Sequence, residues 1–169
     1  MMKKFNQEMI NKIQEAMLPL LKEELGNEIE TVEFKVEDRL AINSLFVTAQ
    51  QEMAAKLTKG GFNLDKTVFI FSDKAPEYKP VVSIYQSINK VTSLGSKRRF
   101  VKSILETIAH EYRHAYQFIN GQIDVEKFIR GEYSYQSASQ YKALETEKDA
   151  FAFQAEFSKK YFKQVLKAL

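Results

Sequence analysis

IAHEYRHAYQF, residues 108–118, contains both histidines of the 169-residue chain. They lie four positions apart, and Glu111 directly follows His110, so the stretch spells H-E-x-x-H. An α-helix completes a turn in about 3.6 residues, which places His110 and His114 one above the other on a single face. If the stretch is helical, two imidazoles therefore point to the same side.

The surrounding residues favour such a helix and give it two different sides. The helical period begins near Phe100 and ends at Asn120 and Gly121, a pair that favours the left-handed backbone used to end helices. When these residues are placed on a helix at about 100° per residue, one side of the helix is apolar and contains Val101, Ile104, Leu105, Ile108, Tyr112 and Ala115. The other side is polar and contains Ser103, Thr107, His110, His114 and Gln117. A polar stripe of this kind is typical of a metal site that lines a cleft, and equally of a surface that faces solvent.

The spacing suits metal-dependent hydrolysis. Two histidines one turn apart can bind the same metal ion, and Glu111 points about 100° further round the helix. From there its carboxylate can hold a water molecule without being a ligand itself. The sequence therefore predicts His110 and His114 as metal ligands.

Catalytic zinc usually takes three protein ligands and leaves one position for water. The chain has no cysteine and no third histidine, so the third ligand must be a carboxylate. The candidates lie in LETEKDAFAF, residues 144–153, and are Glu145, Glu147 and Asp149.

Helical winding of the C-terminal segment separates these candidates. Glu147 falls in the middle of the apolar face, whereas Glu145 and Asp149 fall among the charged residues of the solvated face. A buried carboxylate needs a cation or a hydrogen-bonding partner. We therefore favour Glu147 as the third ligand. A partnership of Glu147 with Arg113, Arg130 or a tyrosine hydroxyl, and ligation by Glu145, stay open.

The remaining chain predicts a mixture of helices and short strands. The expected elements are a helix over 5–25 that Pro19 kinks or divides, a strand around 32–36, a helix over 45–57 that ends at Gly60 and Gly61, strands at 67–71 and 81–85, a short helix from Asp124 to Gly131, a loop over 131–141 and a helix from Leu144 to Leu169. The fold class that follows is α+β.

Composition indicates one folded domain over residues 1–169. Hydrophobic residues make up 44% and charged residues 28% of the chain, close to the average for globular proteins. The apolar runs are far shorter than the roughly 20 residues that span a bilayer, and the N-terminus does not read as a secretory signal. We expect a cytoplasmic protein without a membrane partner. The net charge of +3 does not require a polyanionic partner.

The site residues resemble those of the zincin metallopeptidases, specifically the gluzincins, in which H-E-x-x-H is followed by a helix with a glutamate ligand. Glu147-Lys148-Asp149-Ala150 is also similar to the E-x-[ED]-A signature of compact intracellular members, including those of mobile elements. The resemblance covers residues 110 to about 153. It implies Zn²⁺ bound by His110, His114 and Glu147, with Glu111 as general base.

The same resemblance implies a fold and a mode of substrate binding. The fold is a small, mostly antiparallel or mixed three-stranded sheet that backs the H-E-x-x-H helix, with the glutamate ligand on a C-terminal helix. The strand at 81–85 would be the edge on which an extended peptide docks.

The chain departs from the family pattern at two points. Phe151 stands where members with E-x-x-x-D have an aspartate that orients a ligand histidine, and no third histidine is present to stabilise the transition state. Tyr133, Tyr135 and Tyr141, in the segment before the last helix, are candidates for that stabilising role.

The expected function is zinc-dependent hydrolysis of peptide bonds in a peptide or protein substrate. The alternative is a zincin fold without peptidase activity that binds a protein or nucleic acid as a regulator. A separate hypothesis rests on the cations Lys97, Arg98, Arg99 and Lys102, which are able to contact nucleic acid. Because charge runs are usually solvated, a nucleic-acid partner is the less favoured expectation.

Overall fold

The structure is a computed structural model that describes residues 6–39, 58–130 and 144–169. The helix expected over 45–57 and the candidate residues Tyr133, Tyr135 and Tyr141 lie outside the described residues. Over the described residues the fold is α+β, with a three-stranded mixed sheet and five α-helices. None of these helices is long and apolar enough to cross a membrane.

Helix α1 spans Gln7–Leu25 and lies against the core through its apolar stripe. Its first turn is capped by the Asn6 side chain, which accepts a hydrogen bond from the Met9 N–H at 3.1 Å. The helix runs through Pro19 without being divided, so the expected helix over 5–25 is confirmed as one element. It ends at Gly26, whose φ of 95° suits glycine, and the 3₁₀ helix η1 (Asn27–Thr31) leads to the sheet.

The sheet has the strand order β1-β3-β2. Strand β1 (Glu33–Glu37) pairs in parallel with β3 (Glu77–Tyr85), and β2 (Gly60–Thr67) pairs antiparallel with β3. The expectation of a mixed three-stranded sheet is therefore confirmed. Strand β3 accommodates Pro80 because β1 pairs with β3 only from Val81 onward, so no β1 partner needs the missing N–H.

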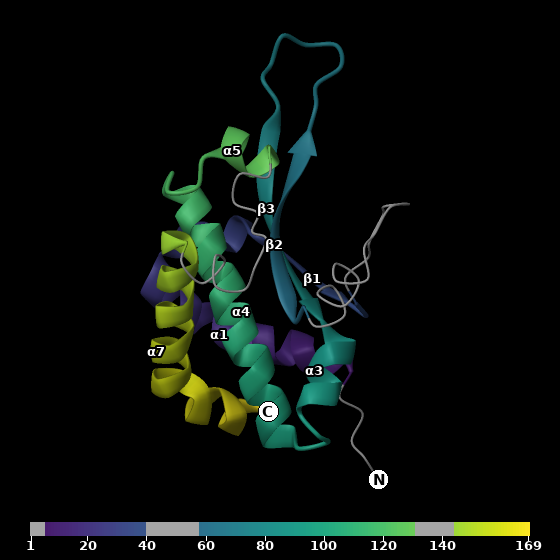
Figure 1. The fold of residues 1–169 in the computed structure, drawn as a ribbon, viewed down its shortest axis with the longest axis vertical. Coiled ribbons are helices and arrows are strands. Elements are labelled where there is room, and N and C mark those ends of the chain that lie inside the picture. The colour runs from purple at the N-terminus through teal and green to yellow at the C-terminus, as the bar shows by residue number, and fades with distance from the viewer. Residues whose placement is uncertain (1–5, 40–57, 131–143) are drawn as a thin grey trace.

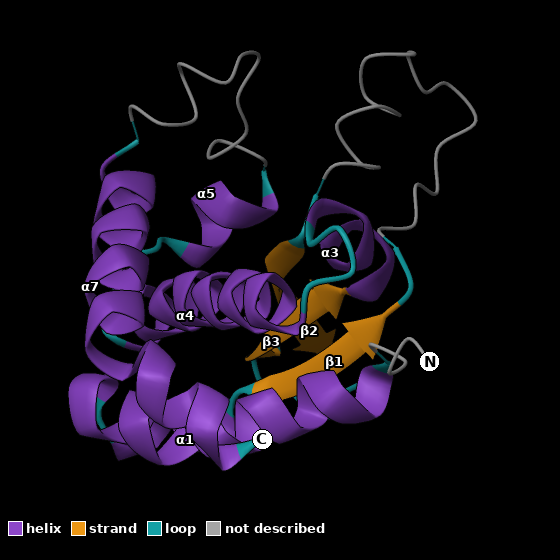
Figure 2. Cartoon of the chain, turned by 90° about the horizontal axis from the view of Figure 1, so that it is seen from below, coloured by secondary structure: helices purple, strands orange, loops and turns teal. Residues whose placement is uncertain are grey.

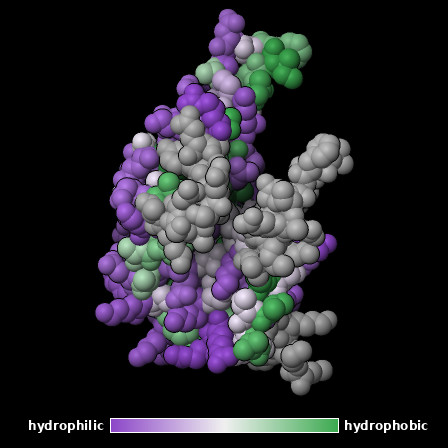
Figure 3. Space-filling model, viewed as in Figure 1, coloured by the Kyte–Doolittle hydropathy of each residue, from purple (hydrophilic) through white to green (hydrophobic). Residues whose placement is uncertain are grey.

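The prediction for the second strand was wrong in position. The sequence favoured a strand at 67–71, but β2 comprises Gly60–Thr67 and includes the two glycines that were expected to end a helix. Val68, Ile70 and Phe71 instead lie at the exposed end of the β2–β3 hairpin, with exposed fractions of 58%, 83% and 101%. Figure 3 shows apolar residues gathered at this end. β-branched and aromatic residues favour a strand only where a partner strand is available to pair.

The prediction that the strand at 81–85 forms an edge of the sheet was also wrong. Strand β3 has a partner on each side, so its main chain cannot add an extended peptide. Within the described part of the chain, β2 is paired on one side only. The β-branched and aromatic residues of 81–85 predict a strand but not its place in the sheet, because strand order depends on long-range pairing.

Helix α4 (Lys97–Ile119) is the centre of the fold and carries the H-E-x-x-H stretch. It lies on one face of the sheet between α1 and α7 (Glu145–Ala168), as Figures 1 and 2 show. The short helices α3 (Gln86–Thr92) and α5 (Val125–Ile129) precede and follow it. The Asp124 side chain caps α5, as expected, by accepting a hydrogen bond from the Lys127 N–H.

Two features hold the start of β2 close to α4. Asn89 is fully buried, donates to the carbonyl oxygens of Lys59 and Tyr85, and accepts from the Ser103 hydroxyl at 2.7 Å. The backbone at Gly60 approaches α4 so closely that an added Cβ would lie 2.5 Å from Cγ2 of Thr107 and 3.3 Å from Cγ of Glu111. Glycine is therefore required where the strand passes the helix.

This contact predicts the effect of Gly60→Ala. The new methyl group would push against Thr107, which is stiff because it is β-branched and helical, so we expect a loss of about 1–3 kcal/mol in the free energy of unfolding. Urea denaturation measures the change. Thr107→Ser removes Cγ2 and keeps the hydroxyl that bonds the Ser103 carbonyl, so it should restore part of the loss in the double variant. An unchanged midpoint for Gly60→Ala would contradict the close approach.

Candidate metal centre

Three buried side chains from two helices converge beside the sheet. His110 and His114 extend from the middle of α4, and Glu147 lies in the first turn of α7. Their exposed fractions are 5%, 7% and 8%. The structure thus brings together the three residues expected to bind the metal, and a buried group of this kind can hold a metal ion.

The donor atoms have the spacing that a single ion requires. His110 Nε2 lies 3.1 Å from His114 Nε2 and 3.1 Å from Glu147 Oε2, and His114 Nε2 lies 3.1 Å from Glu147 Oε1. Ligand atoms at 2.0–2.1 Å from a tetrahedral zinc ion are about 3.3 Å apart. The three donor atoms are therefore close enough together to bind one metal ion.

The outer ring nitrogens of both histidines are held by glutamines. His110 Nδ1 lies 3.0 Å from Gln154 Oε1, and His114 Nδ1 lies 2.8 Å from Gln117 Oε1. An amide oxygen only accepts hydrogen bonds, so each Nδ1 carries the proton. In the neutral imidazoles both Nε2 lone pairs then face the centre of the group, which is the tautomer that binds metals.

The orientation of Gln117 is fixed by its own partners. Its Nε2 donates to the Thr146 carbonyl at 2.9 Å and to Asp149 Oδ2 at 2.7 Å. The Arg113 guanidinium donates two hydrogen bonds to the same carboxylate, at 2.7 and 2.9 Å. Because the amide nitrogen faces these acceptors, the amide oxygen must face His114.

The three carboxylates have different surroundings. Arg113 pairs with Asp149, whereas Glu147 faces the two histidines. The side chain of Glu145 is 87% exposed and pairs with Lys148. Asp149 was expected to face solvent, but its side chain is 41% exposed and anchors Gln117, so that expectation was wrong in part.

Sequence reasoning missed the roles of Gln117 and Gln154. Both follow helical spacing, since Gln117 is three residues after His114 and Gln154 is seven residues, or about two turns, after Glu147. The Phe151 and His110 rings pack edge to face with centroids 4.6 Å apart. Glutamines therefore orient both imidazoles.

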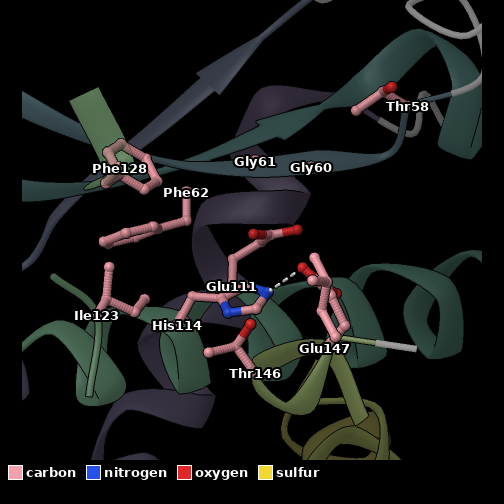
Figure 4. A pocket seen from close by; sticks show the side chains of 11 residues that line it. Thr58, Gly60, Gly61, Phe62, Glu111, His114, Ile123, Phe128, Thr146 and Glu147 are labelled. Carbon is pink, nitrogen blue, oxygen red and sulfur yellow. Dashed lines mark ion pairs between the residues drawn. The ribbon is translucent and has the colours of Figure 1, made fainter. Parts of the chain in front are cut away.

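Glu111 is buried next to this group but is not one of its three members. It is 8% exposed, and burial raises the pKa of its carboxyl, while the adjacent histidines lower it to a smaller extent. A raised pKa makes a carboxylate a stronger proton acceptor near neutral pH. In Figure 4 its side chain lies between His114 and the glycines of β2 and faces the pocket.

The electrostatics at His114 favour a cation in the same place. Burial by itself lowers the pKa of His114. The hydrogen bond with Glu147 and the negative charge of Glu111 together raise the pKa by more than burial lowers it, so the net shift is upward. Glu147 and Glu111 therefore favour positive charge on the His114 ring.

The cations of the nucleic-acid hypothesis lie at the other end of α4. Lys97, Arg98, Arg99 and Lys102 occupy its first two turns. Arg98 stacks over the Phe162 ring at 4.9 Å, and Lys102 pairs with Glu106 at 3.7 Å. Eight residues, about 12 Å of helix, separate Lys102 from His110, so this cluster is separate from the metal centre.

No family model, curated protein or solved structure matches the chain.

The choice of Glu147 over Glu145 predicts the metal content of two variants. Glu147→Ala removes one of three convergent donors and should lose the metal, whereas Glu145→Ala removes an exposed carboxylate and should retain it. Metal analysis of protein purified without added zinc measures both. Loss of the metal from Glu145→Ala alone would refute the assignment.

The hydrogen bond from His114 to Gln117 predicts a weaker site in Gln117→Leu. Such supporting groups are typically worth 10- to 100-fold in metal affinity, so we expect a loss of about that size. Competition with a chromophoric zinc chelator measures it. Gln164→Leu, at an exposed position of α7, is the matched control. Equal affinity in the two variants would show that Gln117 does not support the site.

Proposed function

We propose that this chain is a zinc-dependent metallopeptidase of the gluzincin type. The observation that carries the proposal is the position of the Glu111 carboxylate, which is buried beside the convergent His110, His114 and Glu147 and faces a pocket. A metal group that served only to stabilise the fold would have no need of a second buried carboxylate facing a cavity. The α+β fold with a mixed three-stranded sheet beside α4 supports the proposal, because the zincin resemblance implies a sheet of this kind.

The donor set favours zinc. Two imidazole nitrogens and one carboxylate are typical of catalytic zinc sites that keep a fourth position for water. Other first-row divalent metals also accept imidazole and carboxylate ligands, but calcium and magnesium prefer oxygen ligands alone. When bound, zinc would supply a Lewis acid and lower the pKa of a coordinated water to about 7.

The residues of the chain have separable roles in this proposal. His110, His114 and Glu147 hold the ion, while Gln117 and Gln154 keep the Nε2 lone pairs directed inward. Glu111 accepts a proton from the attacking water and returns it to the leaving amine. The burial that raises the pKa of Glu111 suits both transfers, because the carboxyl group can hold the proton between them.

The substrate would reach the site along the outer edge of β2. Gly60 and Gly61 line the pocket together with Glu111, so strand main chain forms this wall of the site. Among the described strands β2 is paired only with β3, and in this proposal an extended peptide adds to its other edge. We therefore transfer the docking role expected for 81–85 to β2.

Glu111→Gln tests the proposal. The amide cannot accept the proton, so kcat on a susceptible peptide should fall by about 10²–10⁴-fold, while the metal content stays at one ion per chain. Glu156→Gln, exposed on α7, is the control and should keep full activity.

Two outcomes would decide against peptidase activity. Full activity in Glu111→Gln would remove Glu111 from the reaction. Stoichiometric zinc in the wild type without cleavage of any peptide in a broad library would favour the alternative, a zinc-binding protein that acts through partner binding.

A further inference from the structure

A second pocket, of about 390 Å³, extends from the metal centre along α4. One end is lined by His110 and Glu111, and the other end by Lys59 and Ser103. Ser103 comes seven residues before His110 on the same helix, which corresponds to roughly 10 Å along its axis. The end at Lys59 and Ser103 is therefore distant from the ligand atoms, and we call it the distal pocket.

The start of β2 runs alongside α4 in the same chain direction. Gly60 approaches Thr107 closely, and two residues later the Phe62 ring lies 6.2 Å from the ring of His114. Figure 4 shows Thr58, just before the strand, and Phe62 on opposite sides of the site. A peptide that adds to the outer edge of β2 therefore also follows α4, and one of its ends points toward the distal pocket.

The ammonium group of Lys59 has hydrogen-bond donors to spare. A lysine ammonium has three N–H groups. Within the described ranges its one partner is the Ser103 hydroxyl, which accepts at 3.1 Å and donates its own proton to Asn89 at 2.7 Å. The Lys59 residue is half-buried. Two N–H groups at the wall of a pocket therefore remain for an acceptor that a bound molecule would supply.

The main chain of Lys59 is anchored as well. Its carbonyl oxygen accepts hydrogen bonds from the Asn89 side chain at 3.2 Å and from the Tyr85 N–H at 2.9 Å. Asn89 is fully buried. Because both the main chain and the ammonium group are already held, less side-chain freedom is lost when Lys59 binds a ligand.

Glu106 also lines this pocket, but its negative charge is balanced. Its carboxylate lies 3.7 Å from the Lys102 ammonium and accepts a hydrogen bond from the Ser158 hydroxyl at 3.0 Å. Arg99, which is exposed, lies seven residues before Glu106 and so on the same face of α4. Together with Lys59, these cations give the distal pocket and its rim a net positive charge.

We propose that the distal pocket binds a carboxylate of the substrate, either an acidic side chain or the carboxyl terminus of the peptide, and that Lys59 is the specificity-determining residue. A carboxylate is a stronger acceptor for an ammonium than a neutral amide is. Roughly 10 Å corresponds to about three residues of an extended chain, so the carboxylate lies about three residues from the scissile bond. The inference rests on the proposed function, because it takes the peptide to be held at the metal centre.

Cleavage of a mixed peptide pool by the zinc-loaded full chain tests the proposal. Mass spectrometry of the products should show aspartate, glutamate or a free carboxyl terminus enriched about three residues from the cut, on one side only. Selected substrates are then compared with their glutamine analogues and with their amidated forms, which separates the side chain from the terminus as the source of the carboxylate.

Variants of Lys59 connect this preference to the ammonium group. In Lys59→Met, kcat/KM for the acidic peptide should fall by about tenfold, while kcat/KM for its neutral analogue stays the same. Lys59→Arg should keep the preference, and Lys59→Glu should reverse it in favour of a peptide with lysine at that position. Lys163→Met, which removes an exposed charge from α7, is the matched control. An equal loss for acidic and neutral peptides in Lys59→Met would show a structural role and overturn the inference.

A binding experiment separates failure of this inference from failure of the proposed function. Zinc-loaded Glu111→Gln protein is immobilised, and the peptides that it retains from the same pool are sequenced. Enrichment of acidic peptides that disappears in the Glu111→Gln, Lys59→Met double variant supports the distal pocket even if the wild type cleaves nothing. Cleavage without an acidic preference overturns the inference and leaves the peptidase proposal intact. No cleavage and no enrichment overturn both.

Discussion

The structure depends on the convergence of two imidazole nitrogens and one carboxylate in a buried place. Each pair of these donor atoms is 3.1 Å apart, and both imidazole lone pairs face inward because glutamines hold the outer nitrogens. Three acceptors so close together repel one another unless positive charge lies between them. A metal ion held by the three side chains would offset the cost of burying them, and the group joins α4 to α7.

The pairing of α4 with α7 brings this group together and supports it. Along the two helices, Gln117 meets Thr146 and Asp149, Arg113 meets Asp149, His110 meets Gln154, and Ser158 meets Glu106. The order of these contacts shows that the helices run antiparallel. Polar contacts lie beyond the histidines in both directions along α4, at Gln117 and at Glu106. They fix the register of the two helices, so Glu147 cannot shift by a turn without breaking several hydrogen bonds.

The sheet contributes the other wall of the cleft. Gly60 passes α4 at a distance that excludes a side chain, and the buried Asn89 ties the start of β2 to both α3 and α4. As a result Glu111 faces strand main chain on one side and the histidines on the other. The pocket at the site is bounded by β2, α4, α5 and the start of α7.

The sequence by itself determined the elements whose signal is local. Helical periodicity placed α1, α4 and α7, the H-E-x-x-H spacing placed both histidines on one face, and a carboxylate within an apolar stripe singled out Glu147. Tertiary structure decided what depends on partners distant in the chain. It set β2 at Gly60–Thr67 and left residues 68–71 at the exposed end of the β2–β3 hairpin. It also made β3 the central strand and brought Gln154 to His110. The physical reason is that helix faces follow from the geometry of neighbouring residues, whereas strand order, register and side-chain networks depend on contacts between segments that the local pattern does not encode.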